Sequence, residues 1–168
     1  MIDILLAQAQ QQKFSSSYLL YGPRGTGKTS TARLLAKMVN STTDDLATDP
    51  AAKLIDEGKT LDFVEIDAAS HTGVDNIREE IIDKALYPPT ALKTKVYIID
   101  EVHMLSKGAF NALLKIMEEP RDYLMFILAT TEIHKVPDTI VSRCQVFNFK
   151  HHTIENIVKR LQEIADKE

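Results

Sequence analysis

The residues best suited to chemistry lie in one short stretch near the start of the chain. Residues 22–29 read Gly-Pro-Arg-Gly-Thr-Gly-Lys-Thr, which matches the pattern G-x-x-x-x-G-K-[ST] in full. Glycines let successive backbone N–H groups turn toward phosphate oxygens, and a helix that begins at the end of the loop adds its partial positive charge. We therefore predict a site for ATP and Mg²⁺. Its residues would be Gly22, Arg24, Gly25, Thr26, Gly27, Lys28, Thr29 and Ser30.

Within this loop, Lys28 supplies a cation for the β- and γ-phosphates, and the hydroxyl of Thr29 can ligate Mg²⁺. The alternative explanation is an ordinary glycine turn before a helix. A chance match in this context, after an apolar run and before a helical pattern, is expected in well under ~1% of chains of this size.

Two acidic residues complete the pattern of an ATPase. Asp100 and Glu101 follow the apolar run 96–99. Strand alternation would point them in different directions, which suits Asp100 as a Mg²⁺ ligand and Glu101 as general base for an attacking water. Taken alone, the pair would indicate only a solvated turn, but the phosphate loop upstream favours the catalytic interpretation.

Another apolar run ends at Thr130 and Thr131. A hydroxyl at the carboxyl end of a strand lies at the mouth of the ligand crevice in sheets of this kind, where it could position water or the γ-phosphate. Threonine at a strand end is more often structural, so this signal is weak by itself.

Alternating elements must position these residues. Apolar runs predict strands over 18–21, 61–66, 95–99, 123–129 and 145–149. Helical periodicity predicts helices over 2–13, 28–40, 51–57, 74–86, 106–119 and 154–165, with a polar loop at 41–50. This alternation predicts an α/β fold, a five-stranded parallel sheet flanked by helices on both faces.

Composition excludes several classes of protein. The 168 residues fit one domain, and 44% hydrophobic residues exclude a disordered chain. No apolar run approaches the ~18 residues that a membrane span requires, so we expect a cytoplasmic protein with no membrane partner. The single cysteine, Cys144, excludes an intramolecular disulfide, and the net charge of −4 is not typical of a free-standing nucleic-acid binder.

Six stretches of the chain carry a more specific signal. They are 65–70 (EIDAAS), 96–106 (VYIIDEVHMLS), 110–115 (FNALLK), 118–120 (EEP), 128–131 (LATT) and 142–144 (SRC). With the phosphate loop, they resemble the AAA+ module of the γ/τ subunits of bacterial DNA polymerase III, which drive the sliding-clamp loader with ATP. The resemblance implies a P-loop NTPase core over 1–150 and the first helix of a lid domain over 151–168. It also implies a P-loop ATPase, slow in isolation, that serves a DNA-directed DNA polymerase.

The resemblance implies roles for further residues. Thr131, with Thr130 beside it, falls at the family's first sensor. Arg143 would be an arginine finger that acts in the ATP site of a neighbouring subunit, and its surface would form the interface with other clamp-loader subunits. Without the resemblance, Arg143 would be expected in a surface ion pair. The remaining partners implied are the sliding clamp and primed DNA, which ATP-driven loading would bring together during replication.

Contact with DNA would occur in the channel of the assembled ring, without sequence specificity. The candidates are Ser70, Thr72, Ser106 and Lys107, because hydroxyls and helix N-termini bind backbone phosphate. Capping of the following helix explains Ser106 equally well. Nearby, His71 and His103 have no partners at metal-ligand spacing, so we expect packed or solvated histidines.

The chain also departs from the family. Residues 40–60 contain no cysteine, where relatives carry a four-cysteine zinc module, so we predict no zinc. The segment of about thirty residues that helps to hold adenine, and most of the lid, are expected to be missing. Two alternatives remain: a δ′-like scaffold that only donates Arg143, and another AAA+ motor such as the branch-migration type, which the residues 67–70 and 142–144 disfavour.

Overall fold

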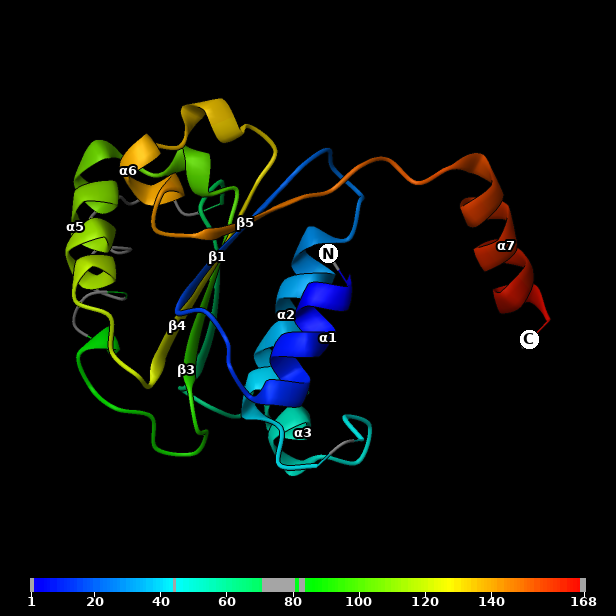
Figure 1. Ribbon diagram of the computed structural model, residues 1–168, viewed down its shortest axis with the longest axis horizontal. Coiled ribbons are helices and arrows are strands. Elements are labelled where there is room, and N and C mark those ends of the chain that lie inside the picture. The colour runs from blue at the N-terminus through cyan, green and yellow to red at the C-terminus, as the bar shows by residue number, and fades with distance from the viewer. Residues whose placement is uncertain (1, 44, 71–80, 82–83, 167–168) are drawn as a thin grey trace.

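The computed structural model describes residues 2–43, 45–70, 81 and 84–166 of the chain, and Figure 1 shows their arrangement. Five parallel strands form one sheet in the order β2-β3-β4-β1-β5. The strands are β1 (Ser17–Tyr21), β2 (Phe63–Asp67), β3 (Lys95–Asp100), β4 (Leu124–Thr130) and β5 (Gln145–Asn148). The sheet confirms the predicted fold class, and its order places β1, which leads into the phosphate loop, between β4 and β5.

Helices cover both faces of the sheet. On one face lie α1 (Ile2–Gln11), α2 (Lys28–Asn40) and α3 (Pro50–Asp56), and on the other lie α5 (Lys107–Glu118) and α6 (Asp138–Val141) (Figure 1). Alternate residues of the central strands therefore enter different cores. On β3, Val96 and Ile98 pack with residues of α2, whereas Tyr97 and Ile99 pack with residues of α5, and all four are fully buried. This double burial explains why the central strands are apolar at successive positions.

The helical predictions agree with the structure where it is described. The bounds of α2 and α7 (Ile154–Ala165) are those expected, and α1 ends two residues earlier than the pattern suggested. Three short elements were not predicted: η1 (Val102–Met104), η2 (Ile133–Lys135) and α6. Elements of three or four residues are too short to show a helical period. Most of the helix expected over 74–86 lies outside the described residues.

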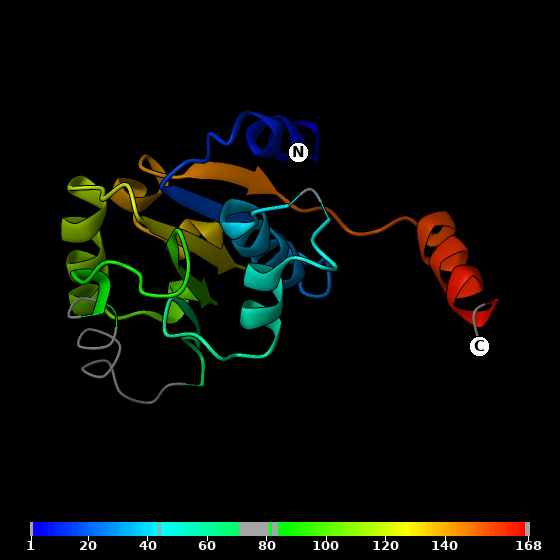
Figure 2. The same cartoon turned by 90° about the horizontal axis from the view of Figure 1, so that it is seen from below.

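Helix α7 stands apart from the rest of the described chain. Figures 1 and 2 both show it separated from the sheet and from the helices that cover it. All of its residues are exposed, including those of its apolar side: Ile154, Ile157, Val158, Leu161 and Ile164. Among the helices that the structure describes, none combines the length and the apolar character that crossing a bilayer requires.

Candidate functional site

The phosphate loop connects β1 to α2, and its three glycines adopt backbone conformations that other residues avoid. Gly22 has φ +148°, and its N–H donates to the carbonyl of Thr130 at 3.2 Å. A Cβ at Gly22 would lie 2.1 Å from the backbone oxygen of Phe149, at the end of β5. Gly27, with φ +91°, is the N-cap of α2, where the described residues provide no side-chain cap. The first N–H groups of α2 are therefore available to an anion.

Lys28 is enclosed by its own loop. Lys28 is only 6% exposed, and its Nζ donates hydrogen bonds to the carbonyls of Gly22 at 2.8 Å and Pro23 at 2.9 Å. The hydroxyl of Thr26 also donates to the Pro23 carbonyl, at 2.8 Å. These bonds curl the loop around the ammonium group, so its positive charge is held at the N-terminus of α2. This is the charge that a triphosphate requires.

Two candidate oxygen ligands for a metal lie side by side next to this charge. The hydroxyl of Thr29 donates to Oδ2 of Asp100 at 2.6 Å, although the two residues are 71 positions apart. A hydroxyl and a carboxylate suit Mg²⁺, which prefers hard oxygen ligands and takes the rest of its coordination shell from phosphate and water. The residues that the sequence proposed for the metal are thus adjacent in space.

These groups line a pocket of 390 Å³ at the carboxyl ends of the strands. Its described lining consists of Arg24, Gly25, Gly27, Lys28, Thr29, Ser30, Asp67, Ala69, Asp100 and Glu101. Of the predicted loop residues, Gly22 and Thr26 are not in this lining. Asp67 and Ala69 were not predicted as part of the pocket. They come from the end of β2, which pairs with β3, so only the strand order identifies them as neighbours of Asp100.

Glu101 reaches the pocket by a turn rather than by strand alternation. Strand β3 ends at Asp100, and Glu101 has φ +48°, in the left-handed region. Its N–H donates to Oδ1 of Asp100 at 2.9 Å, which stabilises this uncommon conformation. The expectation that alternation orients the two acids is therefore wrong for Glu101, because the strand no longer continues there. Both carboxylates line the same pocket.

The end of β4 holds the carboxylate of Glu101. Its Oε2 accepts hydrogen bonds from the hydroxyl of Thr131 at 3.0 Å and from the Thr131 N–H at 3.3 Å. Thr130, beside it, is completely buried, and its hydroxyl lies 2.9 Å from Nδ1 of His103. The two threonines therefore have different contacts, and Thr131 is the one that touches a candidate catalytic group.

His103 was expected to be a packed or solvated histidine, and its contact with the site was not predicted. Its side chain is 6% exposed, with Nδ1 3.4 Å from Oε2 of Glu101 and Nε2 3.4 Å from Oε1 of Glu132. It is packed, as expected, but it is packed against the site. The available signal was its position two residues after Glu101. That signal acquires meaning only when η1 turns the chain back toward β4.

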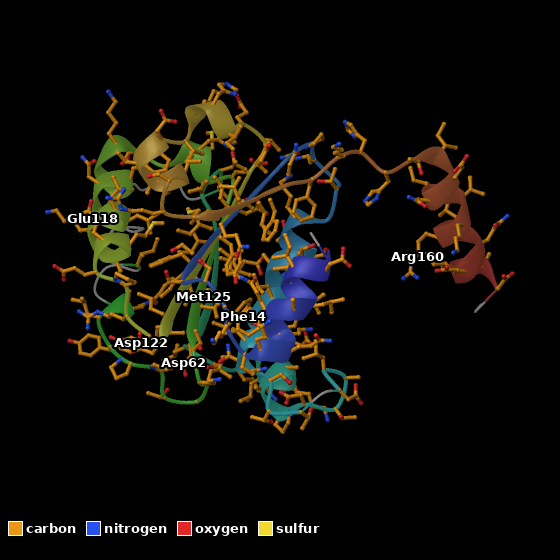
Figure 3. The ribbon with its side chains drawn as sticks, viewed as in Figure 1. Phe14, Asp62, Glu118, Asp122, Met125 and Arg160 are labelled. Carbon is orange, nitrogen blue, oxygen red and sulfur yellow. The ribbon has the colours of Figure 1, made fainter. Side chains whose placement is uncertain are left out.

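Arg143 lies elsewhere and is not among the described residues that line the pocket. Its guanidinium pairs with Glu118 of α5 at 2.9 Å and donates to the carbonyl of Thr139 at 2.8 Å. Glu118 is the last residue of α5, on the face of the sheet opposite to α2 (Figure 3). Next to Arg143, burial raises the pKa of the Cys144 thiol to about 12. Cys144 is thus a protonated packing residue, and Arg143 presents a cation at the surface.

The candidates for DNA contact have local partners. Ser106 is the N-cap of α5, and its hydroxyl accepts from the N–H of Ala109 at 3.1 Å. Lys107 is exposed in the first turn of that helix. The hydroxyl of Ser70 donates to the Asp67 carbonyl at 3.1 Å. Thr72 and His71 lie outside the described residues.

Comparison with known proteins gives these features a context. The sequence model of the family described as DNA polymerase III, delta subunit, matches residues 1–153. The chain is 57% identical over 162 residues to DNA polymerase III subunit tau of Bacillus subtilis, covering 94% of this chain and 29% of that protein. It is 47% identical over 156 residues to subunit tau of Escherichia coli, covering 90% of this chain and 24% of that protein. The chain thus spans less than a third of these two relatives.

Solved structures agree at the level of the fold. A DNA polymerase III gamma subunit-related protein of Thermotoga maritima superposes with a TM-score of 0.66 at 24% identity, covering 95% of this chain and 49% of that one. The DNA clamp loader delta protein of Bacillus subtilis superposes with a TM-score of 0.60 at 16% identity, covering 99% and 48%. The resemblance inferred from the motifs is confirmed by the sequence relatives. The chain belongs to the DNA polymerase III family whose sequence model is described as the delta subunit, and the tau and gamma subunits are among its relatives.

Proposed function

We propose that this chain is the ATP-binding and ATP-hydrolysing module of a DNA polymerase III clamp-loader subunit. The observation that carries the proposal is the contact between Thr29 and Asp100 at 2.6 Å, in the pocket that Lys28 and Glu101 also line. A cation, two metal ligands and a candidate base, from segments far apart in the chain, thus share one pocket. In this proposal residues 1–150 form the nucleotide-binding core and 151–168 the first helix of a lid.

Each side chain has a distinct task in this mechanism. Lys28 leaves the carbonyls of Gly22 and Pro23 and binds phosphate oxygens, as do the N–H groups at the start of α2. Thr29 and Asp100 hold Mg²⁺, which neutralises phosphate charge when bound. Glu101 accepts a proton from the attacking water, and Thr131 keeps its carboxylate in position.

In this proposal Arg143 acts in the ATP site of another subunit, not in that of its own chain. Because it lies on the α5 side and is exposed, we infer that it enters the ATP site of a neighbouring subunit. An arginine supplied in this way neutralises transition-state charge and is worth roughly 10³ to 10⁵ in rate. Hydrolysis would then depend on assembly with other clamp-loader subunits, the sliding clamp and primed DNA. Ser70, Ser106 and Lys107 remain our candidates for contacts with the DNA backbone.

Calorimetric titration with ATP and Mg²⁺ tests the binding step. We expect Lys28→Ala to weaken binding by about 100-fold, since charge-assisted hydrogen bonds contribute ~1.5–3 kcal/mol each. Lys37→Ala is the matched control, because Lys37 lies on the same helix but pairs with Asp56 at 2.5 Å, and its affinity should stay within about twofold of the wild type. Unchanged binding by Lys28→Ala would disprove the proposal.

A further inference from the structure

His103 occupies a buried position between two carboxylates and the end of β4. Nδ1 lies 2.9 Å from the hydroxyl of Thr130 and 3.4 Å from Oε2 of Glu101, and Nε2 lies 3.4 Å from Oε1 of Glu132. A histidine with a 6% exposed side chain must be satisfied by its neighbours, because little water reaches it. Here the neighbours include Glu101, which is a candidate catalytic group, and Thr130, which precedes Thr131, the other residue that contacts Glu101.

The residues at the end of β4 are held by contacts of their own. The Thr130 hydroxyl accepts from the N–H of Glu132 at 3.0 Å, and Glu132 pairs with Lys135 at 2.8 Å. The hydrogen bond from Lys135 lowers the pKa of the Glu132 carboxyl. Thus Nε2 of His103 faces an ionised group, and Nδ1 faces a hydroxyl whose position the Glu132 N–H stabilises.

Within the part of the chain that the structure describes, the contacts of the Glu101 carboxylate all fall on one oxygen. The Thr131 N–H, the Thr131 hydroxyl and Nδ1 of His103 all approach Oε2, at 3.3, 3.0 and 3.4 Å. Oε1 has no hydrogen-bond partner among the described residues. A carboxylate whose one oxygen is anchored presents the other in a defined direction.

We propose that His103 is a positioning residue for the hydrolysis reaction, which anchors Oε2 of Glu101 to the end of β4 and leaves Oε1 free to take the proton from water. This inference rests on the proposed ATPase function, since it assigns to Oε1 the role of general base. His103 itself touches neither nucleotide nor metal. His103 acts through Glu101. It contacts the same carboxylate oxygen, Oε2, as Thr131 does, and it also contacts the neighbouring Thr130.

Steady-state hydrolysis by the whole chain tests this role. We expect His103→Ala to lower kcat by about 10- to 100-fold, the range found for groups that orient reacting residues, with KM changed less than about twofold because nucleotide contacts remain. His103→Asn, whose amide nitrogen replaces Nδ1, should recover most of the loss, whereas His103→Gln, whose nitrogen corresponds to Nε2, should not. A parallel change in kcat and KM, or equal rates for the Asn and Gln variants, would overturn the proposal.

His134→Ala is the matched control. His134 also approaches Glu132, at 3.5 Å, but its side chain is 72% exposed, and within the described residues it contacts neither Glu101 nor Thr130. Its kcat should equal that of the wild type. If His134→Ala lowered kcat as much as His103→Ala, the effect would belong to Glu132 and the proposal would be wrong.

An NMR measurement separates this inference from the proposed function. The amide of Thr131 reports on its bond to Oε2 without any nucleotide. We expect His103→Ala to shift that amide resonance in the same direction as Glu101→Ala, and His134→Ala to leave it in place. An unmoved resonance in His103→Ala would refute the positioning role even if ATP binding through Lys28 is established. A shifted resonance in a chain that does not bind ATP would leave the anchoring intact and refute only the proposed function.

Discussion

Single carboxylates organise this protein by accepting hydrogen bonds from backbone N–H groups. The buried Asp62, at the lower end of the sheet (Figure 3), accepts at Oδ2 from Thr90, Ala91 and Leu92 at 2.6–3.0 Å. Asp49 caps α3 and at the same time closes the polar loop before it, accepting from Thr42 and Ala52. Glu101 in the candidate site is held in a similar way, because its carboxylate accepts hydrogen bonds from the backbone N–H and the hydroxyl of Thr131.

Asp49 allows a prediction about pH. Burial by itself would raise the pKa of its carboxyl, but the hydrogen bonds from Thr42, Ala52 and Thr43 outweigh it and lower the pKa below the ordinary value of 3.8. A lowered native pKa adds stability above pH 3.8 that is lost as the pH falls below it. We expect Asp49→Asn to lose about 1–2 kcal/mol at pH 7 and to unfold with a weaker dependence on pH between pH 5 and 3.

Urea unfolding at a series of pH values provides the measurement. The difference in unfolding free energy between wild type and Asp49→Asn should narrow as the medium becomes more acidic, because below pH 3.8 the unfolded chain binds a proton at Asp49 that the folded chain does not take up. A constant difference across the series would show that Asp49 is not ionised and hydrogen-bonded in this way.

At the scale of elements, one glycine serves both the loop and the sheet. Gly22 directly follows β1, and the carbonyl of Phe149 occupies the space where a side chain would begin. The fixed approach of these two segments is why the phosphate loop starts at this residue. Gly108, by contrast, lies inside α5, where a Cβ would meet only the Ser106 hydroxyl at 3.7 Å.

These two glycines should respond oppositely to alanine. Gly22→Ala combines a collision with backbone and a disfavoured φ, so we expect a loss of at least ~3 kcal/mol in unfolding free energy. Gly108→Ala should gain about 0.5 kcal/mol, because alanine favours the helix and fits the space. Denaturant unfolding of the two variants decides the matter, and a Gly22→Ala variant as stable as the wild type would contradict the packing described here.

For the whole molecule, the pocket and the surface cation are separate features. The phosphate loop opens at the carboxyl ends of the strands, whereas Arg143 pairs with Glu118 on the α5 side, with both side chains partly exposed at 36% and 53%. An exposed ion pair of this kind is weak, at ~0–1 kcal/mol, so a neighbouring phosphate can take Arg143 from Glu118 at little cost.

Two inactive variants should therefore restore each other. We expect hydrolysis per chain to rise with protein concentration, and Arg143→Ala to bind ATP but hydrolyse it very slowly. Mixing Arg143→Ala, which retains the pocket, with Lys28→Ala, which retains the arginine, should recover activity. A wild-type rate that does not depend on concentration would argue against action in trans. Stimulation of a partner by a wild-type chain with no hydrolysis of its own would instead support the donor-only alternative.

Sequence by itself predicted the five strands and the longer helices of the described chain, and it identified the phosphate loop. Helical and strand periods are local patterns, so the sequence predicted α2 with its observed bounds. The phosphate-loop pattern from Gly22 to Thr29 is also local and can be recognised without knowledge of the fold. The acids at 100 and 101 could also be paired with the loop, because an apolar run followed by carboxylates is itself a local pattern.

Only the tertiary structure decided which of these side chains touch. The order β2-β3-β4-β1-β5 brings Asp100 to Thr29 and Asp67 to the pocket, and a left-handed turn at Glu101, not strand alternation, aims that carboxylate at Thr131. In the sequence, the only sign that His103 contacts Glu101 is that the two residues are close along the chain. Nothing in the sequence indicates that Gly22 lies against the backbone of Phe149. The physical reason is that hydrogen bonds and collisions act over a few ångströms between residues tens of positions apart, and the strand order that sets those distances is not a local property of the chain.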